Sequence, residues 1–148
     1  MNTNISSDCY TVLPILHSDI TAIQFKGEYG NLTIINIYNE ITNNNTIHCL
    51  DDLLSLGTGV PSAPGDHMFW LGDFNRHHPM WEDESNEHLF KSEDFIQPFL
   101  ELLYKFNMVM ALPSPCISST VRGYRLTRLS RTIGHGRIMF GVQTTKTA

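Results

Sequence analysis

Two polar side chains that could perform chemistry follow an almost wholly apolar run of this sequence. The run is "HMFWL", residues 67–71, and Gly72, Asp73, Phe74 and Asn75 come directly after it. A carboxylate such as Asp73 can accept a proton from water, and an amide such as Asn75 can donate to a phosphate oxygen. In an extended backbone, the side chains of residues two apart in sequence point to the same face of the strand, so Asp73 and Asn75 would lie side by side. The pair suits hydrolysis of a phosphate ester, although Asp and Asn at strand ends also commonly only cap turns.

The segments that must position these groups have strand and helix patterns. "DITAIQFKG", residues 19–27, predicts a strand that enters a hairpin through the turn "GEYGN". "LTIINIYN", residues 32–39, is rich in β-branched residues and predicts a central strand with Tyr38 at its end. The apolar run extended to residue 74 predicts a further buried strand.

A helical pattern over about residues 45–56, stopped by Gly57, lies between the last two strands. The order strand, helix, strand leaves enough residues for a crossover, so we expect the two strands to be parallel and in one sheet. Tyr38 and Asp73 would then emerge at the same edge. In α/β sheets this carboxyl edge is where ligand crevices form.

A second amphipathic helix is predicted within residues 92–108. Five apolar residues share one helical face: Phe95, Phe99, Leu102, Leu103 and Phe106. Pro98 would cost about 3 kcal/mol in a helix interior, so the regular helix is expected to begin near Gln97. A short strand at 108–115 is expected to follow it. The last 32 residues have no clear period, and they favour only short strands at 121–127 and 136–142.

Length and charge suggest one domain with two electrostatic halves. The 148 residues, 41% of them hydrophobic, fit one globular core, and we expect a segment at 1–17, a core at 18–115 and a divergent basic segment at 116–148. Residues 1–116 hold four basic and all 15 acidic residues, a net charge of −11, whereas residues 117–148 hold six basic residues and no acid. This basic stretch could neutralise phosphates or be only a solvated tail.

The spacing of the cysteines predicts reduced thiols, and the hydropathy pattern predicts no membrane-spanning segment. Cys9, Cys49 and Cys116 form no close pair, as expected of structural thiols. The sequence has no apolar run of about 18 residues and no signal-peptide pattern at its start. We expect an intracellular protein without a membrane partner, with the nucleus as a candidate location.

The stretch "LGDFNRHHPMWED", residues 71–83, resembles the endonuclease/exonuclease/phosphatase superfamily, and within it the endonuclease domains of LINE-type retrotransposons found in fungal genomes. The resemblance covers about residues 18–113 and is most specific from Gly72 to Trp81. It implies an α/β sandwich that hydrolyses DNA phosphodiester bonds with Mg²⁺, which stabilises charge on the phosphate and the leaving oxygen.

Site roles follow from the resemblance where positions match. Asp73 resembles the aspartate that orients or deprotonates the attacking water, Asn75 the asparagine that contacts the scissile phosphate, and Tyr38 the strand-end tyrosine that also reaches it. Arg76, His77 or Trp81 would contact nucleic acid from the following loop. Trp81 could stack on a base, and a place in the core is an equal alternative for it.

The sequence also departs from the family pattern. No strand with the family's Asn, or with its metal-binding Glu, precedes residue 18, so no metal ligand is assigned. Glu101 is the last acid, so no Asp can stand before His135, and Glu40 replaces a frequent Pro. Losing one acid or base partner typically costs ~10²–10⁴ in rate. We therefore expect a partial sandwich lacking N-terminal and C-terminal strands, and leave open whether the chain is an active enzyme.

Three alternatives remain beside the endonuclease interpretation. The first is a non-catalytic remnant or nucleic-acid-binding fragment. The second is a metallophosphatase-like hydrolase, which also places Gly-Asp after a strand but requires a Gly-Asn-His that this sequence lacks. The third is a zinc site made by His77, His78 and His88, less favoured than a polar loop because adjacent histidines point in different directions and no Cys is near.

Overall fold

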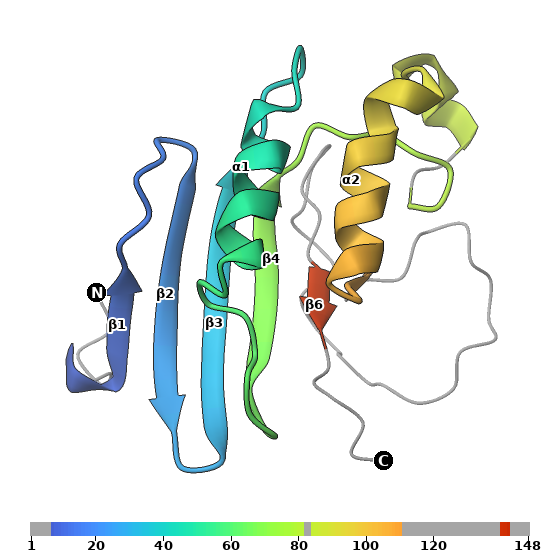
Figure 1. Ribbon diagram of the computed structural model, residues 1–148. Helices are drawn as coiled ribbons and strands as arrows, with labels where there is room; N and C mark the ends of the chain where they lie inside the picture. Colours follow the sequence, from blue (N-terminus) through green and yellow to red (C-terminus); the bar gives the residue numbers. More distant parts are fainter. Residues whose placement is uncertain (1–6, 82–83, 111–139, 143–148) are drawn as a thin grey trace, which may run out of the picture.

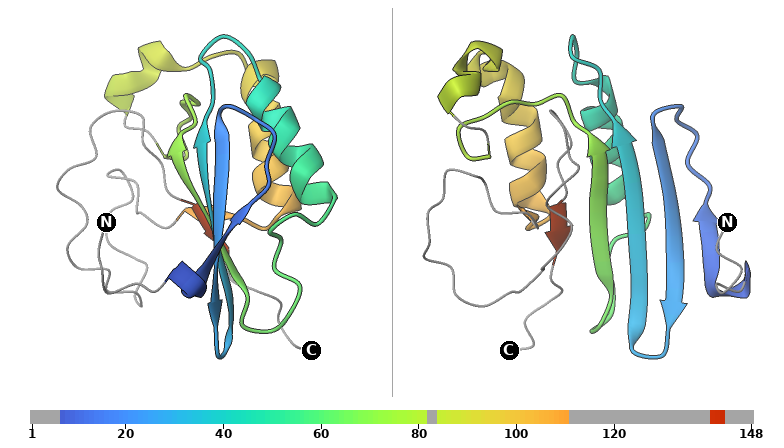
Figure 2. Two further views of the ribbon diagram at one scale, coloured as in Figure 1. Left: turned by 90° about the vertical axis from the view of Figure 1, so that its left-hand side faces the viewer. Right: turned by 180° about the vertical axis from the view of Figure 1, so that it is seen from behind.

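The computed structural model describes residues 7–81, 84–110 and 140–142 of the 148-residue chain. These residues form a six-stranded sheet in the order β1-β2-β3-β4-β6-β5, with α1 and α2 on one face (Figures 1 and 2). In chain order the elements are η1 (Ser7–Cys9), β1 (Tyr10–Leu13), β2 (Ile20–Gly27), β3 (Gly30–Tyr38), α1 (Asn45–Ser55), β4 (His67–Asp73), η2 (Glu84–Leu89), α2 (Glu93–Lys105), β5 (Val109–Met110) and β6 (Phe140–Val142). The predicted α/β class is confirmed. Within the described ranges, no helix has the length and hydropathy to cross a bilayer.

The centre of the sheet matches the sequence prediction. β2 and β3 form an antiparallel hairpin, and β3 and β4 are parallel neighbours joined by the crossover through α1. Their register runs from Leu32 opposite His67 to Tyr38 opposite Asp73. The parallel pair and its shared carboxyl edge are therefore confirmed.

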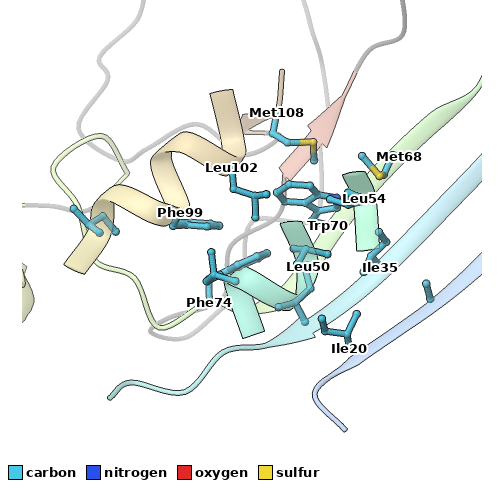
Figure 3. Packing of buried hydrophobic residues seen from close by; sticks show 14 of the residues in the cluster. Ile20, Ile35, Leu50, Leu54, Met68, Trp70, Phe74, Phe99, Leu102 and Met108 are labelled. Carbon is cyan, nitrogen blue, oxygen red and sulfur yellow. The ribbon is translucent and has the colours of Figure 1, made fainter. Parts of the chain in front are cut away.

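The hydrophobic core lies between the sheet and the two helices (Figure 3). Alternation along β3 and β4 turns Ile35 and Trp70 toward the helices, where the side chains of Leu50 and Leu102 meet them. Phe74 stacks on Phe99 with 4.9 Å between ring centroids. The remaining buried members are Ile20, Ala22, Ile37, Ile47, Leu54, Met68, Trp81, Ile96 and Met108. Burial of each large side chain contributes about 1.5–3 kcal/mol.

Helix α1 has the predicted bounds, but α2 begins earlier than expected. It starts at Glu93 and includes Pro98, so the predicted start near Gln97 is wrong. Acidic residues in the first turn, which interact favourably with the helix dipole, support this earlier start. The buried side chains of Ile96 and Phe99 offset the single hydrogen bond that proline removes.

Both ends of the chain add strands to the sheet. β1, which the sequence pattern did not predict, pairs with β2 through Val12 opposite Ile23. β6 confirms the end of the strand predicted at 136–142 and lies between β4 and β5. β5 is the beginning of the strand predicted at 108–115; the rest of that segment, and the strand predicted at 121–127, lie outside the described residues.

The face of β2, β3 and β4 opposite the two helices is here called the far face. Its side chains alternate with the core residues. Apolar residues on it are only partly buried: Ile23, Phe25, Leu32, Ile34, Phe69 and Leu71. At the carboxyl edge of β3 and β4 the far face becomes polar, with Asn36, Tyr38 and Asp73.

Candidate active site

Tyr38 and Asp73 are direct neighbours across the parallel strands β3 and β4. Register partners in a parallel sheet point to the same face, and adjacent strands lie about 4.8 Å apart. Both side chains therefore project from the far face. Tyr38 is 52% exposed and Asp73 is partly exposed. The structure thus places Tyr38 and Asp73, which the sequence predicted at one edge, on the same face of neighbouring strands.

Gly72 allows the strands to approach closely just before this pair. Its φ of +130° lies where residues with side chains are strained, and a Cβ atom there would lie 1.9 Å from the carbonyl oxygen of Ile37. Only glycine fits such a contact. The position of Asp73 beside Tyr38 thus depends on the residue before it.

Asn75 reaches the site through a turn, so the extended backbone considered for Asp73–Asn75 is wrong. Phe74 turns into the core, and Asn75 has a left-handed φ of +49°, a conformation that Asn tolerates better than most residues. The Asn75 backbone N–H donates to Asp73 Oδ1 at 3.1 Å. Asp73 therefore does cap a turn, and its second carboxylate oxygen still offers acceptor capacity.

Asn39, which the sequence analysis did not single out, joins the two strand ends. Its backbone N–H donates to the carbonyl of Asp73 at 2.8 Å, and its Nδ2 donates to the carbonyl of Phe74 at 3.0 Å. Its own carbonyl accepts from Asn75 Nδ2 at 2.7 Å, which uses one of the two Nδ2 hydrogens of Asn75. The only available signal was an asparagine at the end of the stretch predicted as a strand, residues 32–39.

Arg76, predicted to contact nucleic acid, is 2% exposed and donates its hydrogen bonds inside the chain. Nε donates to Asn44 Oδ1 at 3.0 Å, and Nη1 donates to the carbonyls of Asn75 at 2.8 Å and Glu40 at 3.2 Å. Nη2 donates to the Asn43 carbonyl and to Asn44 Oδ1. Burial lowers the pKa of Arg76 to about 10, so the guanidinium remains charged at neutral pH.

Trp81 is also interior, at 7% exposure. Its Nε1 donates to the carbonyl of Arg76 at 2.8 Å, and its ring meets Phe99 edge-on with 5.9 Å between centroids. Of the two places predicted for Trp81, contact with a base or packing in the core, the structure shows packing in the core. Burial of Arg76 and Trp81 argues against their predicted contacts with nucleic acid, whereas His77 is partly exposed.

The described residues do not provide a metal site by themselves. Among them, no group of three or more His, Cys, Asp or Glu side chains could hold a metal ion. Mg²⁺ prefers several oxygen ligands in octahedral geometry, and the carboxylate of Asp73 with the amide of Asn75 falls short of such a set. We therefore assign no metal ligands.

Comparison with known proteins defines the class of fold and then the family. The fold is similar to that of the endonuclease domain of TRAS1, a telomere-specific non-LTR retrotransposon, with a TM-score of 0.57 and 11% sequence identity. The similarity covers 92% of this chain, which spans 57% of the length of that solved domain. Residues 32–123 match the family described as endonuclease-reverse transcriptase, and the chain belongs to that family. No curated protein matches it. The resemblance predicted from residues 71–83 is confirmed.

Proposed function

We propose that this chain carries part of an active site that hydrolyses DNA phosphodiester bonds. The observation that carries the proposal is the strand register that sets Tyr38 beside Asp73 on the far face. Asn75 is held in the turn that directly follows Asp73. Membership of the endonuclease-reverse transcriptase family supports DNA as the substrate, which would require a nuclear location.

Each of the three side chains has a role that its chemistry allows. The Asp73 carboxylate accepts the proton of the attacking water, through the oxygen that does not cap the turn. The second Nδ2 hydrogen of Asn75 and the hydroxyl of Tyr38 donate to phosphate oxygens as negative charge develops on them. The Asn75 amide is held before the reaction by its bond to the Asn39 carbonyl, and the strand register places Tyr38 on the same face as Asp73.

The family resemblance implies Mg²⁺ as the cofactor. A bound cation would supply charge stabilisation at the phosphate and the leaving oxygen. The described residues lack a sufficient ligand set, and the roles given above to Asp73, Asn75 and Tyr38 involve no metal-dependent step. Metal dependence is therefore tested separately, by comparing Mg²⁺ with EDTA.

A non-catalytic nucleic-acid-binding fragment is the second candidate. The observation in its favour is charge: residues 117–148 hold six basic side chains and no acid. Each Lys or Arg that contacts a phosphate releases counterions, so this binding would weaken as salt rises. Replacing these six basic residues with Ala should then abolish binding while keeping β6, the strand of this segment that pairs with β4 beside the site.

A plasmid-nicking assay separates the two candidates. If the site is catalytic, the protein nicks supercoiled DNA in Mg²⁺, and Asp73→Ala slows nicking by about 10²–10⁴-fold because the proton acceptor is gone. Asp52→Ala is the matched control, since Asp52 is an exposed acid on α1, which covers the opposite face of the sheet.

Three outcomes of this assay are informative. Nicking that survives in Asp73→Ala would show that Asp73 is not the base. Absence of nicking by the unaltered protein at high concentration would refute catalysis by this chain. Salt-sensitive DNA binding in that case would favour the second candidate.

A further inference from the structure

Arg76 is a buried cation whose hydrogen bonds are accepted by uncharged oxygens. The acceptors are backbone carbonyls and the side-chain amide of Asn44. Burying a guanidinium without such partners would be strongly unfavourable. These five hydrogen bonds account for the place of Arg76 in the interior, but they do not explain why the chain has a charged residue there at all.

The partners of Arg76 belong to three separate segments. The carbonyl of Asn75 is in the turn that forms the site, and the acceptors from Glu40 to Asn44 lie in the loop between β3 and α1. The guanidinium carbon lies 4.3 Å from the centre of the Phe95 ring on α2. Asn44 completes the connection, since its Nδ2 donates to the Phe95 carbonyl at 3.0 Å.

This arrangement fixes both sides of the turn at Asn75. On one side Asn75 is held by the bond from its Nδ2 to the Asn39 carbonyl, and on the other its own carbonyl is held by Arg76. Asn39 is the first residue of the β3–α1 loop, and Arg76 binds the carbonyl of the next residue, Glu40. One planar cation with several donors can hold both strand-end segments together in a way that the single ammonium of a lysine cannot.

We propose that Arg76 is a positioning residue, which fixes the direction of the Asn75 side-chain amide by holding the β3–α1 loop against the turn after β4. The role of that amide toward phosphate rests on the function proposed above. The positioning itself can be measured without any nuclease activity.

The first test is spectroscopic and uses the full chain. The side-chain ¹⁵N–¹H signals of Asn75 are identified by their loss in Asn75→Asp. In the unaltered protein, the bond to the Asn39 carbonyl should separate the two ¹H shifts of this amide. Arg76→Lys keeps the charge but loses the planar set of donors, and it should move both shifts toward solvent-exposed values. Unchanged Asn75 signals in a folded Arg76→Lys protein would overturn the proposal.

Two further variants keep the test decisive. Asn44→Ala leaves the guanidinium in place and removes its amide acceptor, so it should shift the Asn75 signals in the same direction even if Arg76→Lys does not fold. Asp66→Asn is the matched control, because Asp66 is another buried charge, 5% exposed, directly before the amino end of β4. It should leave the Asn75 signals unchanged; if it shifts them equally, Arg76 has only a general structural role.

The nicking assay then separates the two proposals. If the site is catalytic, Arg76→Lys should lower kcat about 10–100-fold with KM changed less than about 3-fold, because a misaligned donor weakens transition-state binding. Asp66→Asn should leave kcat unchanged. If the unaltered protein does not nick DNA while the Asn75 signals still respond to Arg76→Lys, the proposed function fails and the positioning role stands. A kcat unchanged in Arg76→Lys would refute positioning for catalysis.

Discussion

At each end of strand β4, a buried charged side chain is held by several hydrogen bonds, and the two charges have opposite sign. Just before the strand, the buried carboxylate of Asp66 accepts hydrogen bonds from the backbone N–H groups of Asn31, Ser62 and Ala63 and from the Asn31 side chain, at 2.8–3.1 Å. After the strand, the buried guanidinium of Arg76 donates to carbonyl and amide oxygens. The seven residues of β4 separate these two anchors by roughly 20 Å.

The difference between the ends is in the polar groups that remain. All four bonds at Asp66 satisfy backbone or amide donors, two from Asn31 near the start of β3 and two from the loop that precedes β4. At the Arg76 end, the described part of the chain gives the buried Oδ1 of Asn39 no partner, and Asn75 has a left-handed backbone. An unsatisfied buried acceptor costs about 1–3 kcal/mol. Each feature also occurs elsewhere, since Trp70 Nε1 in the middle of β4 has no partner among the described residues and Asn107 has a left-handed φ of +50°. Their coincidence beside Asp73 is what distinguishes the carboxyl end, because such features gather at functional sites.

The largest expected effect is at the carboxyl end, from Gly72→Ala. The added methyl group would lie 1.9 Å from the Ile37 carbonyl oxygen at a backbone angle unfavourable for alanine. The strands must separate, and we expect the free energy of unfolding to fall by about 3 kcal/mol or more. Urea unfolding followed by circular dichroism measures this loss, and nicking should disappear with it.

Gly57→Ala provides the control for Gly72→Ala. Gly57 also has a positive φ, +82°, but a Cβ atom there would meet nothing within 4 Å. Its substitution should therefore cost only about 1 kcal/mol of backbone strain. Equal losses in the two variants would mean that backbone conformation, and not the contact with Ile37, makes glycine necessary at position 72.

Asp66→Asn should produce the intermediate effect, at the amino end. Replacing the charged acceptor weakens four bonds, and we expect a loss of about 1–3 kcal/mol at pH 7. Hydrogen bonds, first from the Asn31 backbone and then from Ser62, hold the pKa of Asp66 below its usual value despite its burial. A lowered carboxyl pKa stabilises the fold above the unfolded-state value of about 3.9 and loses that contribution as pH falls through the folded-state value.

Urea unfolding at pH 7 and pH 3 tests this pH dependence. The difference in stability between the unaltered protein and Asp66→Asn should shrink at the lower pH, because pH 3 lies below the unfolded-state pKa of about 3.9, where the unfolded chain binds a proton at Asp66 that the folded state binds less readily. Asp51→Asn is the control, because Asp51 pairs with Lys105 on the surface and should contribute less than about 1 kcal/mol. If nicking changes along with stability in Asp66→Asn, the two ends of β4 are not functionally separate.

The same contrast explains what the sequence could predict. Strands β2, β3 and β4 and helix α1 follow from hydrophobic periodicity, and the parallel crossover then places Tyr38 beside Asp73. These inferences need only local patterns and one topological rule. The early start of α2 was missed because local propensity overstated the effect of one proline, and β1 was missed because a strand of four residues has too little pattern.

Arg76 shows why the rest of the site could not be predicted. A charged residue after a strand is normally exposed, and nothing near it in sequence indicates burial. Its partners in the β3–α1 loop lie 32 to 36 residues away along the chain, and Asn39 is equally distant from Phe74. Such bonds form only once the crossover has brought the two strand ends together. Asp73 and Asn75 were recognisable from their chemistry and Tyr38 from the family resemblance, whereas the residues that position them became visible only in the folded structure.

The smallest expected effect is at His78, in the loop that leaves the carboxyl end. Burial lowers its pKa, against the opposing influence of Glu93, and its Nδ1 accepts the Met80 backbone N–H at 3.2 Å. Since the folded state binds this proton less readily than the unfolded state, His78 contributes full stability above the unfolded-state pKa of about 6.5 and loses it as pH falls toward the folded-state value. His78→Gln should therefore flatten the fall in stability between pH 7 and pH 5.

The centroids of the His78 and Trp81 rings lie 5.1 Å apart, and Trp81 Nε1 donates to the Arg76 carbonyl. Protonation of His78 should therefore also shift the Trp81 indole N–H signal. A shift that extends to the Asn75 amide would show that the Arg76 anchor transmits loop changes to the site, and a shift confined to Trp81 would show that the anchor isolates the site from them.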